Sequence, residues 1–382
     1  MAEYKMVRLG DVCEIQSGGT PSRSKTEYWK DGTIPWVKIG DFSGKYLDKT
    51  TEHITQQGLD NSSAKLFSKG TILYSIFATL GEATILNIDA TTNQAIAGIK
   101  IKDKSSVDVD YFYSFLKSLK DEVNRIGRGV AQNNINLSIL KSFFIPLPPL
   151  ETQKQIAAQL DKCTAVIAKH KQMLEKYDTL IKSRFIEMFG DPVQNSMKWE
   201  VSELGDQCTE VRYGTSKPAV ENGKYPYLRM NNITYDGHLD LSNLKYIDID
   251  DEELPKCSVR KGDILFNRTN SIDLCGKTCL FNFDNVMVIA GYIIRVRLNE
   301  KLNPQYVTTF FNTKTIKKLL REMAKGAVNQ ANINAQEMQA IRIPLPPIAL
   351  QNDFAAFVQQ IDKSKFEIAN SLKRLYNKGM LS

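Results

Sequence analysis

The sequence has no long apolar segment. Its mean hydropathy is −0.30 over 382 residues, and no hydrophobic run approaches the roughly 18 residues that a membrane-spanning helix needs. The N-terminal stretch MAEYKMVRLGD also lacks the apolar core of a secretion signal. We therefore expect a soluble protein that stays in the cytoplasm.

Cysteine and histidine are scarce and scattered. The six cysteines are Cys13, Cys163, Cys208, Cys257, Cys275 and Cys279, and the three histidines are His53, His170 and His238. Such spacing excludes a disulfide framework and lacks the paired ligands of a zinc site, so we expect reduced thiols and no bound metal. His170 falls on a helical apolar seam, where a packed side chain is a better interpretation than a ligand.

Motifs for nucleotide chemistry are also missing. The sequence contains neither a G-x-x-x-x-G-K-[ST] phosphate loop nor a G-x-G-x-x-G turn that opens a helix after a strand. The doubled prolines stand in LPPL and LPPI, not in the N/D-P-P-Y/F motif with which amino-methyltransferases hold a flipped base. The chain is therefore expected to have no catalytic residues.

The charge balance is mildly basic. Lys and Arg number 50 against 43 Asp and Glu, a net charge of +7 with a pI near 8.9. This excess is compatible with nucleic-acid binding but does not establish it, because many basic proteins bind none.

What the chain does have is an internal repeat. FIPLPPL at 144–150 returns as RIPLPPI at 342–348, and the matches Gln153/Gln351 and Asn-Ile-Asn at 134–136/332–334 keep the same order along the chain. KGTILYS and KGDILFN match further upstream, as do IPWVKI and YPYLRM. We conclude that the protein is built twice.

Each copy has the same predicted organisation. Strand signals such as TIPWVKIGDF and IAGIKIK come first, and a helix near 109–126 or 305–323 and a short strand lead into the prolines, which end the strand. Apolar residues then recur in alternating steps of four and three, which indicates a coiled coil. The seam positions are Ile156, Leu160, Cys163, Ile167, His170, Leu174, Tyr177 and Ile181, and then Leu350, Phe354, Phe357, Ile361, Ser364, Ile368, Leu372 and Leu375.

These signals predict an α+β fold. Two similar mixed α/β domains are joined by two long antiparallel coiled-coil helices, with pseudo-two-fold symmetry. The predicted boundaries are 1–148 for the first domain, 149–190 for the central helix, 191–346 for the second domain and 347–382 for the C-terminal helix. At 1.5 Å per residue the central helix would span about 55–60 Å.

The domain loops mix basic, amide and hydroxyl side chains. Arg reads guanine and Asn or Gln reads adenine, while Lys, Ser and Thr hold phosphates. The predicted DNA-contacting residues of the first domain are Ser17, Thr20, Ser22, Arg23, Lys25, Lys38, Arg128, Gln132 and Asn133. Those of the second are Arg212, Tyr213, Thr215, Lys217, Arg229, Asn231, Asn232, Asn267, Arg268, Asn329 and Gln330. Ordinary solvated loops are the alternative, and the Asn-Ile-Asn elements suit turn caps equally well.

The order of domain, IPLPPLETQKQIAAQLD helix, SRFIEMFGDP, domain and IPLPPI helix resembles the specificity subunit of type I restriction–modification systems, over essentially the whole chain. The resemblance implies that each domain is a target recognition domain for one half of a bipartite double-stranded DNA sequence. It also implies helices that set the unread spacer and dock two methyltransferase subunits.

The resemblance places the chemistry on partners. Methyltransferase subunits would methylate adenine from S-adenosylmethionine, and restriction subunits would use ATP and Mg²⁺, with no cofactor on this chain. The alternatives are the recognition subunit of another restriction or phage-defence system, a coiled-coil scaffold that binds no DNA, and an enzyme such as a nuclease with an unrecognised site.

Overall fold

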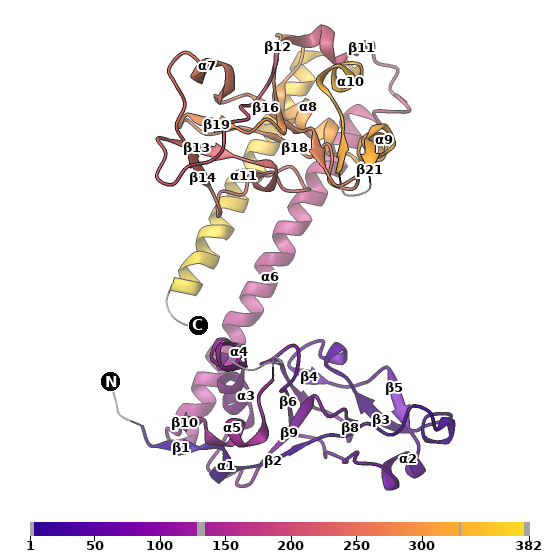
Figure 1. The fold of residues 1–382 in the computed structure, drawn as a ribbon, viewed down its shortest axis with the longest axis vertical. Helices are drawn as coiled ribbons and strands as arrows, with labels where there is room; N and C mark the ends of the chain where they lie inside the picture. The colour runs from indigo at the N-terminus through magenta and orange to yellow at the C-terminus, as the bar shows by residue number, and fades with distance from the viewer. Residues whose placement is uncertain (1–3, 128–133, 328–329, 378–382) are drawn as a thin grey trace. The chain divides into compact units, whose positions relative to one another are not determined.

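The computed structural model describes residues 4–127, 134–327 and 330–377 (Figure 1). The chain divides into two compact units, one of Met1–His170 with Ser371–Ser382 and one of Lys171–Asn370. The long helix α6 (Leu150–Phe189) runs from the first unit into the second. We call the part of the chain before α6 the first head, and the part between α6 and α11 (Ile348–Asn377) the second head.

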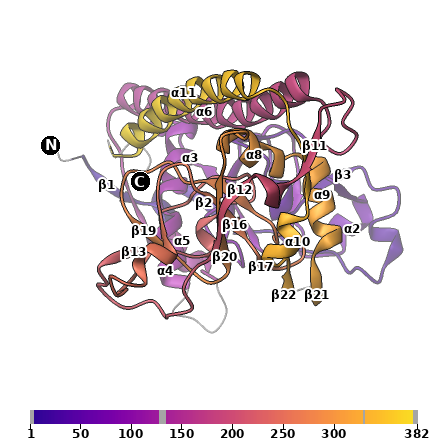
Figure 2. The same ribbon diagram turned by 90° about the horizontal axis from the view of Figure 1, so that it is seen from above.

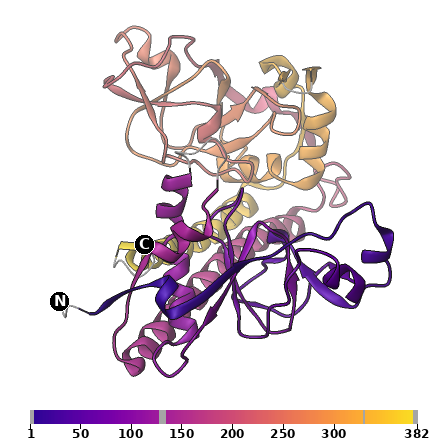
Figure 3. The same cartoon turned by 60° about the horizontal axis from the view of Figure 1, so that its bottom comes forward.

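The first head is built on two sheets, a five-stranded one in the order β2-β9-β6-β7-β4 and a three-stranded one in the order β5-β3-β8. A two-stranded ribbon, β1 with β10, leads into α6. The strands are β1 (Met6–Arg8), β2 (Cys13–Ser17), β3 (Ile34–Val37), β4 (Tyr46–Leu47), β5 (Glu52–Ile54), β6 (Ile72–Ser75), β7 (Ala83–Leu86), β8 (Thr91–Thr92), β9 (Ile96–Ile101) and β10 (Phe144–Pro146). The strands of this head, in indigo and violet, lie at the end of α6 where that helix begins (Figures 1 and 3).

The core of the first head lies between the large sheet and its helices. Every residue of β6 is buried, and Phe112 of α3 packs against the same apolar cluster. Burial on both faces explains why the strand reads as a continuous apolar run. The helices are α1 (Leu9–Val12), α2 (Gln56–Asp60), α3 (Val109–Ser118), α4 (Lys120–Gly127) and α5 (Leu137–Ser142), with short 3₁₀ turns η1 (Thr26–Tyr28) and η2 (Ile39–Asp41).

The second head repeats this plan with four-stranded sheets ordered β12-β20-β16-β18 and β14-β13-β19-β15, and it has an added three-stranded sheet, β17-β22-β21. The strands are β11 (Val201–Glu203), β12 (Cys208–Tyr213), β13 (Tyr225–Leu228), β14 (Lys245–Ile247), β15 (Ser258–Val259), β16 (Ile264–Asn267), β17 (Thr269–Asn270), β18 (Thr278–Leu280), β19 (Met287–Ile289), β20 (Ile293–Leu298), β21 (Lys325–Ala327), β22 (Gln330–Asn332) and β23 (Arg342–Pro344). The helices are α7 (Leu254–Cys257), α8 (Pro304–Phe311), α9 (Lys314–Met323) and α10 (Ala335–Gln339), with 3₁₀ turns η3 (Leu204–Gln207) and η4 (Met230–Asn232).

The repeat extends to individual hydrogen bonds. Each head has a sheet with one parallel strand pair at the same place. In the first head β3 pairs with β8, Trp36 opposite Thr91, and in the second β13 pairs with β19, Tyr227 opposite Val288. The second asparagine of each Asn-Ile-Asn caps a short helix: the Asn136 side chain accepts from Ile139, and the Asn334 side chain accepts from Glu337. The turn-cap interpretation is therefore confirmed for these two asparagines.

One expectation is wrong in detail. The sequence predicts a single helix near 109–126 and another near 305–323, but each region folds as two helices, α3 with α4 and α8 with α9. In the second head the break coincides with Thr313, whose hydroxyl accepts from the Ile316 amide and starts a new helix.

The two long helices are antiparallel within the second unit. The Phe185 ring lies 5.6 Å from that of Phe354, and Asp178, earlier in α6, is ion-paired with Lys365, later in α11. Figure 2 shows the yellow α11 running beside α6. All predicted seam positions of both helices are buried or half-buried, so the heptad pattern is confirmed.

No helix of the described residues is long and apolar enough to cross a membrane. Within the same residues no group of three or more His, Cys, Asp or Glu is arranged to hold a metal ion.

Candidate nucleic-acid interface

A groove of about 490 Å³ opens on the second head and gathers residues from four separate loops. It is lined by Thr215 and Lys217 after β12, Arg229 and Asn231 after β13, Arg268 after β16, and the turn before β20. These five residues were predicted from the sequence as DNA contacts. Strand ends bring them together, since the loops that follow neighbouring strands open at one edge of the sheets.

Arg268 is fixed from two sides. Its guanidinium carbon lies 4.8 Å from the ring centroid of Tyr213, and its Nε donates to Asn332 Oδ1 at 3.2 Å. Tyr213 is itself held, because its hydroxyl accepts from the Ala335 amide at 2.9 Å. An arginine held in this way has little conformational entropy left to lose on binding. This restraint favours bidentate recognition of a base or a phosphate.

Arg229 occupies the other side of the groove. Its Nη2 donates to the Asn243 carbonyl at 3.0 Å, and its Nε is buried without a hydrogen-bond partner among the described residues. A buried guanidinium N–H group without an acceptor is costly, so this side chain can still donate a hydrogen bond to an anion or to a base edge.

Two predicted contacts have buried side chains instead. Asn232 donates to the Asp240 carbonyl, and its oxygen accepts from the Arg229 amide. Asn267 donates to the carbonyls of Thr269 and Tyr292. Since both asparagines are buried and bonded to backbone, neither is available to a ligand in this structure. They position the arginine-bearing loops.

Lys217 meets acidic partners. Its Nζ lies 2.9 Å from Asp250 and 2.7 Å from Glu253, and these hydrogen bonds raise the pKa of the lysine. The Thr215 hydroxyl donates to the same Glu253 at 2.9 Å. The lysine and its acids therefore form a charged rim on one side of the groove.

The remaining predicted residues of the second head lie on its surface. Arg212 is ion-paired with Glu210, and Gln330 is exposed at the start of β22. Asn329 lies outside the described residues.

In the first head two of the predicted cations, Arg23 and Lys38, form one cluster. Arg23 lies 2.6 Å from a Glu52 carboxylate oxygen, and Lys38 lies 2.5 Å from the other. The Arg23 guanidinium carbon is 3.6 Å from the ring centroid of Trp29 and 4.8 Å from that of Trp36. The structure thus brings a loop arginine, a strand-end lysine and an aromatic platform together.

The other first-head predictions lie around this cluster. The Ser22 carbonyl accepts from the Trp29 indole at 3.0 Å, and Lys25 donates to the Tyr28 hydroxyl at 2.9 Å. Thr20 donates to the Gln94 side chain, and Ser17 ends β2 half-buried. Arg128, Gln132 and Asn133 lie outside the described residues.

The heads place a cation at the same point of the fold. Lys38 directly follows β3, and Arg229 directly follows β13, the matching strand of the second head. The backbone amide of each donates to a side chain three residues later, that of Asp41 and that of Asn232 respectively. Sequence reasoning missed the acid Glu52 and the half-exposed aromatic Tyr292, which lines the second-head groove. The available signal for Tyr292 was a tyrosine directly before the apolar run that forms β20.

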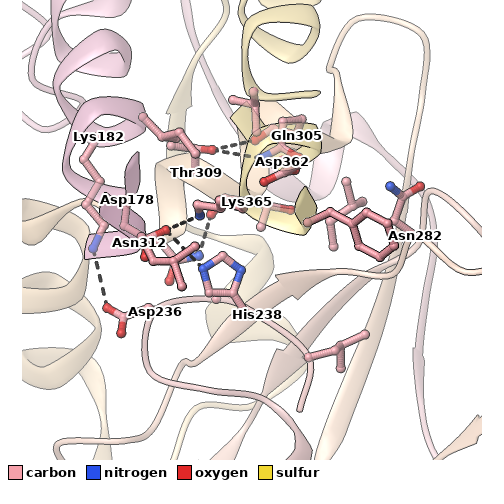
Figure 4. Close-up of a pocket in the computed structure, with 18 of the residues that line it drawn as sticks. Asp178, Lys182, Asp236, His238, Asn282, Gln305, Thr309, Asn312, Asp362 and Lys365 are labelled. Atoms are coloured by element: carbon pink, nitrogen blue, oxygen red, sulfur yellow. Dashed lines mark hydrogen bonds and ion pairs between the residues drawn. The ribbon is translucent and has the colours of Figure 1, made fainter. Parts of the chain in front are cut away.

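A second hollow of about 590 Å³ lies between the second head and the helices of its own unit (Figure 4). Asp178 of α6 lines this hollow. Its Oδ1 lies 3.2 Å from His238 Nε2 and is ion-paired with Lys365 of α11. Burial alone would raise the pKa of Asp178, but these two partners lower it to about 2. The head loop at His238 is thereby tied to both helices.

Comparison with known proteins identifies the family. A family model described as the type I restriction modification DNA specificity domain matches residues 1–176 and again 197–375. The chain belongs to the family of type I restriction–modification DNA specificity subunits. The two matches, one over each head and its helix, agree with the internal repeat.

Individual relatives support this. The specificity subunit of the EcoKI type I restriction enzyme of Escherichia coli K12 is 23% identical over 380 residues, covering 92% of this chain and 81% of that subunit. The MjaIX specificity subunit of Methanocaldococcus jannaschii is 29% identical over 253 residues, 60% of this chain and 58% of that subunit. Specificity subunits are recognition components, and neither the scaffold nor the enzyme alternative is supported by these relatives.

Solved structures share the fold. The type I S subunit of M. genitalium superimposes with a TM-score of 0.55 at 15% identity, over 99% of this chain and 95% of that one. A chain from a structural study of complex assembly and conformational transition in the type I system gives 0.59 at 18% identity, over 100% and 96%. The predicted fold class is thus confirmed by these structures, and the predicted family by the family model.

Proposed function

We propose that this specificity subunit binds double-stranded DNA with both heads, each of which reads one half of a bipartite target. The observation that carries the proposal is the groove of the second head, where Arg229, Arg268 and Asn231 meet at the ends of buried strands. Arginine and asparagine are the residues that read guanine and adenine, and a rigid scaffold that carries variable loops suits sequence recognition.

The first head supplies the matching surface through Arg23 and Lys38. Of the residues predicted from the sequence, the exposed cations Lys25 and Arg212, the amides Asn231 and Gln330, and Tyr213 are retained as direct contacts. Lys217, Thr215, Thr20, Ser17 and Ser22 would hold phosphates, since their chemistry suits the backbone of DNA. Arg128, Gln132, Asn133 and Asn329 stay predictions from the sequence.

The long helices would set the unread spacer between the two half-sites and dock two methyltransferase subunits. Those partners would flip and methylate one adenine in each half-site from S-adenosylmethionine, and restriction subunits would use ATP and Mg²⁺ to cut unmodified DNA. The present chain contributes recognition and position. The proposed boundaries of its parts are 1–148, 149–190, 191–346 and 347–382.

The test is co-expression with the cognate methyltransferase subunit in a methylation-deficient host, followed by single-molecule sequencing of modified adenines. A two-part motif with an unread gap, methylated on both strands, is the expected result. Exchange of one head should change one half of the motif only. Absence of any motif, with assembly of the complex demonstrated, would contradict the proposal.

A further inference from the structure

The acid Glu52 connects the two cations of the first head. It opens β5 opposite Trp36 of β3, so its side chain is a close neighbour of Lys38, which lies two residues after Trp36 and directly follows β3. Its Oε1 lies 2.5 Å from Lys38 Nζ, and its Oε2 lies 2.6 Å from Arg23 Nη1. A single anion therefore pairs with two of the cations that this head is proposed to offer to DNA, Arg23 and Lys38.

The cluster is built rather than incidental. The indoles of Trp29 and Trp36 meet edge to face at 5.0 Å, and their N–H groups donate to the carbonyls of Ser22 and Gly19. These bonds fix the loop that carries Arg23, and the guanidinium lies on the Trp29 ring. An arginine restrained by an aromatic face loses less entropy when it binds a carboxylate, so the pair is favoured over that of a free side chain.

The second head lacks this acid. The residue that opens β14 opposite Tyr227 is Lys245, and the cation two residues beyond Tyr227 is Arg229. Among the described residues neither Arg229 nor Arg268 forms an ion pair. The same strand position thus carries a negative charge in one head and a positive charge in the other.

We propose that Glu52 is a specificity-determining residue of the first head, whose carboxylate neutralises Arg23 and Lys38 and so weakens attraction to DNA of the wrong sequence. The proposal rests on the proposed DNA-reading function. Non-specific binding depends on contacts between cations and phosphates and on the release of counterions. Because the Glu52 carboxylate is already paired with the two cations, a phosphate can bind them only after it displaces this carboxylate. Only a target that adds base contacts offsets that loss.

The size of the effect follows from the exposure of the groups. The Glu52, Lys38 and Arg23 side chains are 28%, 39% and 53% exposed, so solvent screens both pairs. Two such pairs correspond to about 2- to 30-fold in non-specific affinity. Two additional phosphate contacts would steepen the salt dependence, the slope of log affinity against log salt, by about 1–2.

The experiment compares the 382-residue chain with its Glu52→Gln variant on a duplex of about 30 base pairs that lacks the methylated motif, across a potassium chloride series. We expect tighter binding of this duplex, a steeper salt slope and a smaller preference for a duplex that carries the motif. The matched control is Glu14→Gln, which removes one exposed carboxylate of the same head that forms no ion pair among the described residues. Equal effects of the two substitutions would reduce the result to net charge and overturn the proposal.

A reciprocal variant in the second head keeps the proposal testable even if Glu52→Gln does not fold. Lys245→Glu places an acid beside Arg229 of the second head and should weaken binding of the motif-free duplex. If Glu52→Gln leaves non-specific affinity and salt slope unchanged while the wild type binds DNA, the role of Glu52 is contradicted and the proposed function stands. If the wild type shows no salt-dependent DNA binding even with its methyltransferase partner, the proposed function itself fails.

Discussion

Gln153 and Gln351, which lie in the first turns of α6 and α11, make the same three hydrogen bonds. The amide nitrogen of Gln153 donates to the carbonyls of Ser106 and Pro148, and its oxygen accepts from the Asp108 amide. Gln351 bonds the carbonyls of Lys301 and Pro346 and the amide of Asn303. Both side chains are fully buried. Each glutamine therefore connects a head to the helix that follows it. We call the proline-rich segments at these connections, 144–150 and 342–348, the necks, and the glutamine hydrogen bonds the neck bonds.

Gln153→Leu should destabilise the chain by about 2–4 kcal/mol, because it leaves one buried N–H group and two carbonyls without partners. Gln351→Leu should have a similar effect. Urea unfolding measures the loss, and Gln155→Leu on the exposed face of α6 is the control. A loss no larger than that of the control would show that the neck bonds contribute little.

Arg268→Ala should weaken binding of a duplex that carries the methylated motif by about 10- to 100-fold, since a good bidentate base contact has that value. Arg268→Lys should not restore affinity, because lysine can neither stack on Tyr213 nor form a fork. Fluorescence anisotropy measures both. The exposed Arg260, changed to alanine, controls for the loss of one positive charge. Equal losses for the two alanine variants would remove Arg268 from the reading surface.

Asp178 should make the second unit sensitive to acid. Its pKa is lowered to about 2 by His238 and Lys365, against an ordinary value of 3.8. A carboxyl whose pKa is depressed in the folded state stabilises fully above its unfolded pKa, and the stabilisation is lost as the pH falls from about 4 to about 2.

Asp178→Asn should therefore lower the free energy of unfolding by about 1–2 kcal/mol at pH 7, a figure reduced for partial exposure. The difference from wild type should shrink below pH 4. Thermal unfolding between pH 2.5 and 7 measures it, with the exposed Asp353→Asn on α11 as control. A difference that stays constant over this range would contradict the electrostatic explanation.

We expect Glu210 to stabilise the second head, and we expect no comparable contribution from the equivalent residue of the first head. It lies 2.9 Å from the fully buried Arg295 and 2.5 Å from Arg297. Glu210→Leu leaves a buried guanidinium without its anion, which costs about 3–5 kcal/mol. Strand register makes Glu14 the equivalent residue of the first head, where the strand position that matches Arg295 is Gly98. Glu14→Leu should change stability little, and comparable losses in urea unfolding would contradict this account.

The sequence predicted those parts of the fold that depend on local patterns. The prolines marked the necks, and the heptads marked α6 and α11, because strand ends and helix seams follow from residue type and spacing. Five groove residues of the second head were predicted because the loops that follow its strands carry arginine, lysine, amide and hydroxyl side chains.

What the sequence could not show depends on contacts between distant segments. The burial of Asn267 requires the Tyr292 carbonyl, 25 positions away, and the pairing of Glu52 with Arg23 requires both the β3–β5 register and the indole-held loop. Each of the two expected helices is replaced by a pair, α3 with α4 and α8 with α9. In the second head the reason is local, because the Thr313 cap competes with a continuous apolar stripe.

The neck bonds have a consequence for inheritance. Every partner of the two glutamine side chains is a main-chain atom, and the segments they hold, Ser106–Asp108 and Lys301–Asn303, share no residue type at matching positions. A head of unrelated sequence can therefore join the same helix, provided that its backbone takes the same path. Genes for such subunits could exchange whole heads by recombination at the neck, and a lineage could acquire a new target without having to evolve a new joint.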